Sequence, residues 1–270
     1  MTTGRPRDRL IDIGQPRIQA TGVIIKSPRE IDVMRQAGQV VAKTINVLLK
    51  EVRAGITTGE LDSIAHNCIL EGGSKPSFLG YRGFPATICT SINEEIVHGI
   101  PGKRVLRDGD VLSLDVGAIV GGYHGDSATT VGVGKITSQA ARLLRVSEGS
   151  LGAAIRQCRG GARMGDISWA VQQYAESQGF SVVKEYVGHG IGRALHEEPS
   201  VPNFGAPGKG VVLKPGMVLA IEPMVNVGEW RTRLLDDDWT VVTGDGTLSA
   251  HFEHTVAITE GEPEVLTARS

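Results

Sequence analysis

The sequence has few cysteines and no long apolar run. Its three cysteines, Cys68, Cys89 and Cys158, are odd in number and include no Cys-x-x-Cys pair, so they predict reduced thiols rather than disulfide bonds. No apolar run reaches the about 18 residues of a membrane span, and the N-terminus has arginines but no apolar core of a signal peptide. We therefore expect a cytoplasmic protein without a membrane segment.

The chain also lacks a strong charge of either sign. Its net charge of −2 gives no general case for nucleic-acid binding, so we expect no specific DNA partner. No composition break divides the 270 residues, and a hydrophobic fraction of 40% is enough for a sizeable core. We predict a single domain over residues 27–270.

Residues 1–26 differ from the rest because basic side chains outnumber acidic ones. The charged residues are Arg5, Arg7, Arg9, Arg17 and Lys26, against Asp8 and Asp12. One interpretation is a solvated and partly mobile basic arm, and the other is a docking element for an anionic partner such as ribosomal RNA. Ribosome binding that survives deletion of residues 1–25 would exclude the second interpretation.

Helix signals occur in two pairs. Ser27-Pro-Arg-Glu30 combines a capping box with proline at the first helical position, and apolar residues follow at helical spacing, so we predict a helix over 28–50. Thr57 starts a second helix that ends at Gly72-Gly73, and the second half repeats the pair at 138–157 and 165–178. Strand-like segments lie at 86–90, 96–100, 111–119, 123–133, 182–187, 218–227, 239–243 and 251–259. This order predicts an α+β domain in which helices cover one face of a curved antiparallel sheet.

The stretch 106–127 carries the most information. It resembles two short strands joined by a turn at Gly121-Gly122, so Asp115 and Asp126 fall on facing strands of a hairpin. Two carboxylates are thereby expected to converge.

Parts of this stretch recur later in the chain. The matches are Leu106–Asp115 with Leu213–Glu222, His124-Gly-Asp126 with His251-Phe-Glu253, His98-Gly-Ile with His189-Gly-Ile, and 53–73 with 159–179. A period of about a hundred residues is too long for a solenoid. It predicts two copies of one unit that face each other, with four acids and a histidine at the join.

These five residues, Asp115, Asp126, His189, Glu222 and Glu253, stand in apolar or glycine-rich strand contexts. Any one of the acids alone is more often a turn or edge residue, and a lone histidine is more often structural, but acids at matching places in both repeats are hard to explain by chance. Buried carboxylates need cations, because desolvation costs several kcal/mol each. Few lysines or arginines lie nearby in sequence, so we predict two divalent ions about 3.5–4 Å apart.

The motifs resemble those of type I methionine aminopeptidases. The resemblance rests on Thr90–Pro101, Asp115, Gly125-Asp126, Gly188–Gly192, His196–Pro199, Ile221–Met224 and Phe252–Thr255, in that order. It covers about residues 27 to 266 and implies the pita-bread fold, a pseudo-twofold α+β domain. It also implies removal of the N-terminal methionine from nascent proteins and peptides, with preference for a small second residue.

The resemblance further implies a role for each site residue. Asp115, Asp126 and Glu253 would hold one divalent ion, and Asp126, His189, Glu222 and Glu253 the other, with cobalt, manganese, iron, zinc or nickel as candidates. The ions would activate a hydroxide that attacks the first peptide bond.

Three further roles follow from the same resemblance. Glu222 would act as general base, His196 would hydrogen-bond the carbonyl oxygen, and His98 would contact the peptide nitrogen. The repeat pairs His98 with the ligand His189, whereas the family makes His98 a substrate contact. We follow the family here.

A methionine pocket is implied as well. Its walls would be Phe78, Tyr81, Phe84, Cys89, Leu195 and Trp239. Taken alone, most of these would be interpreted as core residues. Phe84 and Leu195 stand where the family more often has tyrosine and phenylalanine, and both keep the pocket apolar. We expect a monomer that acts on nascent chains beginning with methionine.

Three alternatives remain open at this point. Xaa-Pro peptidases share the fold and ligands but are expected to carry a long N-terminal domain, and only about 26 residues precede the first predicted helix here. Type II methionine aminopeptidases carry an inserted subdomain, yet His196 and Glu222 are only 26 residues apart. A metal-free binding module on the same scaffold should have lost ligands, and this chain has lost none.

Overall fold

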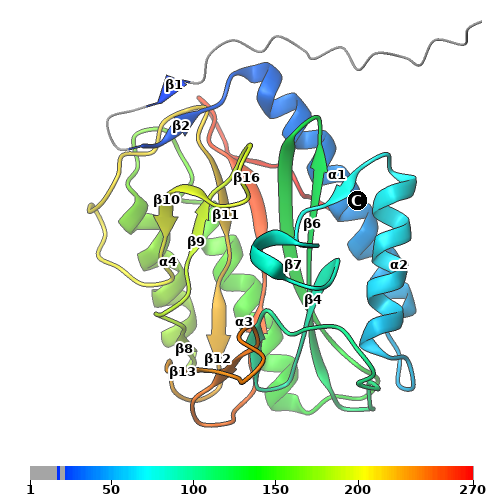
Figure 1. Ribbon diagram of the computed structural model, residues 1–270. Helices are drawn as coiled ribbons and strands as arrows, with labels where there is room; N and C mark the ends of the chain where they lie inside the picture. The colour runs from blue at the N-terminus through cyan, green and yellow to red at the C-terminus, as the bar shows by residue number, and fades with distance from the viewer. Residues whose placement is uncertain (1–16, 19–21, 270) are drawn as a thin grey trace, which may run out of the picture.

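The computed structural model describes residues 17–18 and 22–269. It contains helices α1 (Pro28–Glu51), α2 (Thr58–Glu71), α3 (Ser138–Ile155) and α4 (Met164–Glu176), so the four predicted helices are confirmed to within a few residues at each end. Capping boxes at Ser27 and Thr57 start α1 and α2, because each side chain accepts from the backbone three residues on. The helices pack in the pairs α1–α2 and α3–α4 (Figure 1). None of the helices in the described residues is long and apolar enough to cross a membrane.

The strands pair in antiparallel fashion throughout the described residues. They are β1 (Arg17–Ile18), β2 (Ile24–Ile25), β3 (Lys75–Pro76), β4 (Ile88–Ile92), β5 (Glu95–Val97), β6 (Val111–Val120), β7 (Tyr123–Gly132), β8 (Ser181–Val182), β9 (Gly188–Gly190), β10 (Glu197–Val201), β11 (Val218–Ile221), β12 (Met224–Asn226), β13 (Thr232–Leu234), β14 (Val241–Thr243), β15 (Ser249–His251), β16 (His254–Ala257) and β17 (Glu264–Val265). The predicted α+β class with antiparallel pairing is confirmed.

The strands form several sheets rather than one continuous sheet. The first half forms the order β3-β6-β4 with β7 beside β6, and the second forms β10-β9-β11-β16-β17. The predicted strands 218–227 and 251–259 each break in two, at Glu222-Pro223 and at Phe252-Glu253. Pro223 has no N–H to donate to a ladder. Both segments change sheets at this place, because β11 pairs with β16 in one sheet whereas β12 pairs with β15 in another. The predicted strand 182–187 shortens to β8, and β9 and β10 were not predicted.

The predicted duplication is visible in matching backbone contacts. An isolated bridge joins Thr57 to Val105 in the first half, and another joins Arg163 to Val212 in the second. Two equivalent hydrogen bonds, from residue 55 to residue 106 and from residue 161 to residue 213, are each 2.9 Å long. Both halves therefore close the loop before their second helix against the segment that enters the acid-bearing strand.

The register corrects one of the predicted matches, that of His98 with His189. In the first half, Ser113 lies two residues before Asp115 and pairs with Ser91. In the second half, Ala220 lies two residues before Glu222 and pairs with His189. His189 therefore occupies the place of Ser91. His98 lies beyond β5 with φ +61°, and the shared His-Gly-Ile sequence does not reflect a shared position.

A second match is shifted by two residues. The acid of β6 faces Ala128, and continuation of the β11–β16 register places Glu222 opposite Glu253. Glu253 thus takes the place of Ala128. The backbone nitrogen of Glu253 donates to the carbonyl of Ala128 at 3.0 Å. Asp126 instead meets Thr255, whose Oγ1 accepts from the Asp126 nitrogen at 3.0 Å and donates to its carbonyl at 2.7 Å. The two halves therefore place their second acids at different steps of the ladder.

Each half has its own apolar core beneath its helix pair. Ile45 of α1 and Leu61 of α2 are fully buried against β4 and β6, and Leu143 of α3 and Ile167 of α4 are fully buried in the second half. Helix α1 also lies directly on β7, because a Cβ on Gly125 would come within 2.8 Å of the backbone of α1. This close contact fixes the strand that carries the second carboxylate.

Candidate functional site

The β6–β7 hairpin positions the first two carboxylates. Its two-residue turn, Gly121-Gly122, has φ values of 55° and 82°, a conformation that favours glycine and suits a tight hairpin. Asp115 faces Ala128 and Asp126 faces Gly117, so both carboxylates lie on the same face of the ladder, one diagonal step apart. The predicted convergence of the two side chains is therefore seen in the structure.

The second half adds the other members at the points where its strands break. Glu222 follows β11, Glu253 precedes β16, and His189 lies in β9 beside β11. Ligand atoms of Asp126, His189 and Glu253 all lie within 4.8 Å of one another. The His189 Nε2 lies 3.5 Å from an oxygen of Glu222. We call Asp115, Asp126, His189, Glu222 and Glu253 the acidic cluster.

Three carboxylates of the acidic cluster are only partly satisfied by the protein. One oxygen each of Asp115, Asp126 and Glu253 has no hydrogen-bond partner among the described residues. Burial and then the charge of Glu222 raise the pKa of Asp115 to about 6, against the opposing effect of His251. Burial and the neighbouring carboxylates raise the pKa of Asp126 and of Glu253 as well. Orphaned oxygens in this number are what a bound cation would satisfy.

Neighbouring groups set the ionisation of Glu222 and the ring orientation of His189. Burial raises the pKa of Glu222, but the neighbouring histidines lower it, so the net shift is downward. The Nε2 atoms of His251 and His189 each lie 3.5 Å from a Glu222 oxygen. The Nδ1 of His189 lies 2.9 Å from the carbonyl of Gly190. A ring that donates from Nδ1 leaves Nε2 free as a ligand atom, so this contact suits metal coordination.

One cavity of about 150 Å³ contains the acidic cluster and every other site residue predicted from the sequence. Its lining comprises Phe78, Tyr81, Arg82, Phe84, Cys89, His98, Asp115, Asp126, His189, Leu195, His196, Glu222, Trp239 and Glu253. Only Arg82 in this set was not predicted. Its signal in the sequence is the Gly80-Tyr-Arg-Gly83 turn, in which Arg82 itself has φ +50°.

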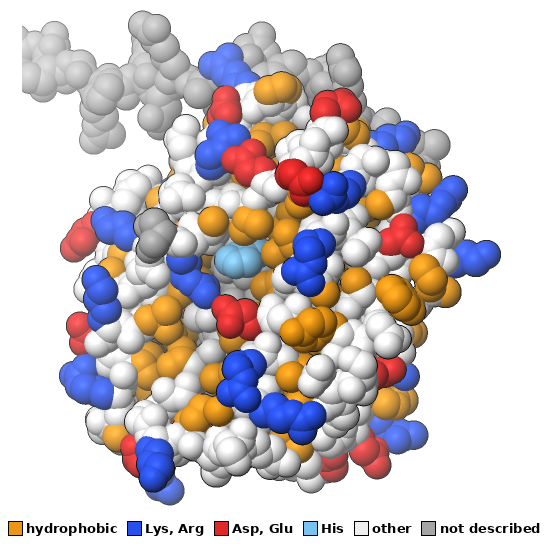
Figure 2. Space-filling model, turned by 180° about the vertical axis from the view of Figure 1, so that it is seen from behind, with side chains coloured by type: hydrophobic (Ala, Val, Ile, Leu, Met, Phe, Trp, Pro, Cys, Tyr) orange, Lys and Arg blue, Asp and Glu red, His pale blue; other side chains and the backbone are white. Residues whose placement is uncertain are grey.

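His196 lies at the exposed mouth of the cavity. Its Nδ1 lies 2.8 Å from the hydroxyl of Tyr81, and the two rings stack with centroids 5.4 Å apart. Its ring centroid is also 4.1 Å from that of His189. Figure 2 shows the molecule from the side opposite to that of Figure 1, where hydrophobic side chains lie among both basic and acidic ones.

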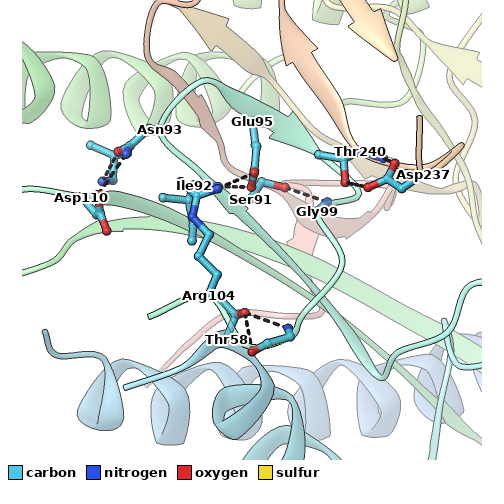
Figure 3. Close-up of polar contacts among 12 residues, drawn as sticks. Thr58, Ser91, Ile92, Asn93, Glu95, Gly99, Arg104, Asp110, Asp237 and Thr240 are labelled. Atoms are coloured by element: carbon cyan, nitrogen blue, oxygen red, sulfur yellow. Dashed lines mark hydrogen bonds and ion pairs between the residues drawn. The ribbon is translucent and has the colours of Figure 1, made fainter. Parts of the chain in front are cut away.

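His98 lies in a loop that polar contacts hold in a left-handed conformation. Ser91 Oγ accepts from the nitrogen of Gly99 at 3.1 Å, and Glu95 accepts from Ile92 at 2.7 Å and from Arg104 at 2.6 Å (Figure 3). Burial is the largest effect on the pKa of His98 and lowers it, which favours a neutral ring.

Trp239 faces His98 from the neighbouring loop. The carboxylate of Asp237 accepts from the nitrogens of Trp239 and Thr240 and from the Thr240 hydroxyl, at 2.6–2.9 Å (Figure 3 shows the contacts with Thr240). The Trp239 ring lies edge-on to two other rings, with its centroid 5.0 Å from that of Phe84 and 6.3 Å from that of His98. The apolar wall of the cavity is thereby fixed by an exposed acid outside it.

Phe78 and Cys89 complete the apolar wall from the first half. A Cβ on Gly117 would come within 2.7 Å of the Phe78 ring, so the glycine allows that ring to lie against β6. Cys89 pairs with Asp115 across the ladder, and burial followed by the charge of Asp115 raises the pKa of its thiol. All three cysteines are free and buried, in agreement with the prediction of reduced thiols.

Comparison with known proteins decides which family this geometry belongs to. Residues 32–260 match the model of metallopeptidase family M24. A methionine aminopeptidase of Bacillus subtilis is 55% identical over 91% of this chain and 99% of its own length, and one of Clostridium perfringens is 53% identical over 91% and 98%. The chain belongs to the M24 methionine aminopeptidases. The predicted family is therefore confirmed.

Solved structures agree with this assignment. The methionine aminopeptidase of Thermotoga maritima has a TM-score of 0.90 at 45% identity, over 92% of this chain and all of the other. That of Rickettsia prowazekii has a TM-score of 0.90 at 40% identity, over 91% and 100%. A prolidase of Pyrococcus horikoshii shares the fold, with a TM-score of 0.74, but is only 20% identical and is covered over 64% of its length. The predicted pita-bread fold is confirmed for this metallopeptidase.

Proposed function

We propose that this M24 metallopeptidase removes the N-terminal methionine from nascent proteins and peptides, and that the acidic cluster holds a pair of divalent cations for this reaction. The observation that carries the proposal is the single cavity in which unpaired carboxylate oxygens adjoin an apolar wall. The relatives of this chain are named methionine aminopeptidases, which agrees with the predicted substrate. The family makes the enzyme metal-dependent.

The donor set supports two ions rather than one. Asp115, Asp126 and Glu253 would hold one ion, and Asp126, His189, Glu222 and Glu253 the other, with Asp126 and Glu253 shared. Four carboxylates carry too much negative charge for one divalent ion. Bound ions would lower the pKa of water and polarise the first peptide carbonyl. Carboxylates with one imidazole suit manganese, iron, cobalt, zinc or nickel.

The protein side chains supply proton transfer and positioning. Glu222, whose pKa is lowered, is ionised near neutral pH and acts as general base and proton carrier. The Tyr81 hydroxyl lies 2.8 Å from Nδ1 of His196, and in the tautomer in which Tyr81 is the donor, the Nε2–H of His196 donates to the peptide carbonyl oxygen as negative charge develops. His98, which also lines the cavity, contacts the peptide nitrogen.

Specificity comes from the apolar wall. Phe78, Phe84, Cys89, Leu195 and Trp239 form a pocket that suits an unbranched thioether, and Tyr81 joins them at the mouth. The small volume of the cavity favours a small second residue such as glycine, alanine or serine.

The remaining assignments concern the setting of the enzyme. We propose a monomeric, cytoplasmic protein with its catalytic domain over residues 27–270 and a basic arm over residues 1–26 that contacts the ribosome. Most of the arm lies outside the described residues, whereas Val23 and Lys26 at its end are buried in the body.

Release of methionine from Met-Ala-Ser tests the proposal. We expect cleavage by the metal-loaded protein, loss of activity with a chelator, and recovery when divalent metal is restored. Cleavage of Xaa-Pro dipeptides in preference to Met-Ala-Ser would favour an Xaa-Pro peptidase. A protein that neither binds metal nor cleaves the peptide would favour a binding module on the same scaffold.

A further inference from the structure

A buried lysine just before α1 reaches the turn that carries two of the site residues. The Lys26 Nζ lies 2.6 Å from Oε2 of Glu197, and the two side chains are only 2% and 5% exposed. The backbone nitrogen of Lys26 donates to the carbonyl of Gly216 at 2.8 Å. Lys26 was counted among the basic side chains of the predicted arm, but its main chain and its ammonium group are both held inside the body.

The partner of Lys26 directly follows His196. The strands β9 and β10 end and begin at Gly190 and Glu197, so the turn between them carries Leu195 and His196. One oxygen of Glu197 accepts a hydrogen bond from the Lys26 ammonium group, and the other accepts from the backbone nitrogen of Ala194 at 3.2 Å. The same carboxylate therefore joins Lys26 to the main chain of the turn.

The turn leaves little space for movement around this ion pair. A Cβ on Gly192 would lie 2.6 Å from both the Glu197 carboxylate and the Lys26 side chain. On the other side of the turn, the Arg193 guanidinium lies 4.6 Å from the centre of the Tyr123 ring, whose hydroxyl donates to Glu30 of α1 at 2.6 Å. Lys26 and Tyr123 thus hold the turn in two places, and Tyr123 is in turn hydrogen-bonded to α1.

The energetics indicate a geometric role for the pair. Burial is the largest effect on the pKa of Lys26 and lowers it, against the attraction of Glu197. A buried ion pair seldom stabilises a protein more than an apolar pair of the same size, but it fixes the positions of both partners.

We propose that Lys26 and Glu197 are positioning residues, whose ion pair sets the 192–197 turn so that His196 faces the peptide carbonyl and Leu195 closes the methionine pocket. The inference rests on the proposed roles of those two residues. It assigns to the segment before α1 a direct influence on catalysis, although that segment does not line the cavity.

The double variant Lys26→Met/Glu197→Gln tests the role without leaving an unpaired buried charge. We expect kcat for Met-Ala-Ser to fall about tenfold or more, because displacement of a reacting group by about 1 Å can cost about a hundredfold. The ratio of Met-Ala-Ser to Leu-Ala-Ser cleavage should also fall, since Leu195 moves with the turn. Arg159→Met is the matched control, because it removes a 2.7 Å ion pair with Glu262 whose side chains are 53% and 73% exposed.

Two readouts separate positioning from general destabilisation. The kinetics are measured on protein whose circular dichroism shows it folded, and the ¹⁵N shift of His196 Nδ1 reports its contact with Tyr81. The proposal would be overturned if the double variant had the same kcat, the same substrate ratio and the same His196 shift as the wild type. Wild-type enzyme that releases no methionine would instead refute the proposed function.

Discussion

Asp115→Asn should stabilise the metal-free protein, and the gain should grow with pH. Asp115 has its pKa raised from 3.8 to about 6, chiefly by burial and by Glu222. A carboxyl with a raised folded pKa contributes stability below its unfolded pKa and loses it as pH rises through the folded pKa. A rise of this size corresponds to about 3 kcal/mol, most of which is lost between about pH 4 and pH 6.

The assay is urea unfolding of chelator-treated wild type and Asp115→Asn from pH 4 to pH 7. We expect the difference in unfolding free energy to rise from near zero to about 3 kcal/mol in favour of the variant. Removal of this charge also relieves Asp126 and Glu253, whose pKa values it helps to raise. The exposed Asp32→Asn variant is the control and should change stability by less than about 0.5 kcal/mol.

Adding divalent metal should reverse the order, because only the wild type keeps the full donor set. A pH-independent difference, or a variant less stable than wild type at pH 7 without metal, would refute the reasoning that crowded carboxylates destabilise the empty cluster.

Three further predictions follow from single residues. Glu222→Ala should lower kcat for Met-Ala-Ser by about 10²–10⁴-fold while circular dichroism stays unchanged, and full activity would contradict its role as general base. Tyr81→Phe loses the hydroxyl 2.8 Å from Nδ1 of His196, so kcat should fall several-fold with a smaller change in KM, and an unchanged kcat would count against this contact. Gly125→Ala should cost about 1–3 kcal/mol in urea unfolding, because its Cβ would lie 2.8 Å from the backbone of α1, whereas Gly102→Ala, with nothing within 4 Å, should be nearly neutral. Equal stability of these two alanine variants would exclude the predicted clash.

Local patterns in the sequence were enough to predict much of this structure. The capping boxes at Ser27 and Thr57 start helices where predicted, because such signals act within one helical turn. The turn at Gly121-Gly122 fixes the hairpin register and with it the convergence of Asp115 and Asp126. The resemblance to methionine aminopeptidases added the pocket residues, which composition and spacing alone would leave as core.

Contacts between distant segments could not be predicted in this way. The His-Gly-Ile motif suggested that His98 and His189 were equivalent, whereas only the strand register shows that His189 takes the place of a serine. Glu253 proved to be two residues out of step for the same reason. The Lys26–Glu197 pair joins residues 171 apart, and no periodicity in the sequence relates such positions.

The most direct test of the account is the number of divalent ions that the folded chain binds. Metal-free protein would be dialysed against manganese and the bound metal counted by elemental analysis, for wild type and for Asp126→Asn/Glu253→Gln, which removes both shared ligands. We expect two ions per wild-type chain and strongly reduced binding in the double variant. No bound metal in the wild type, or the same stoichiometry in the variant, would contradict the claim that the buried carboxylates form a dinuclear metal site.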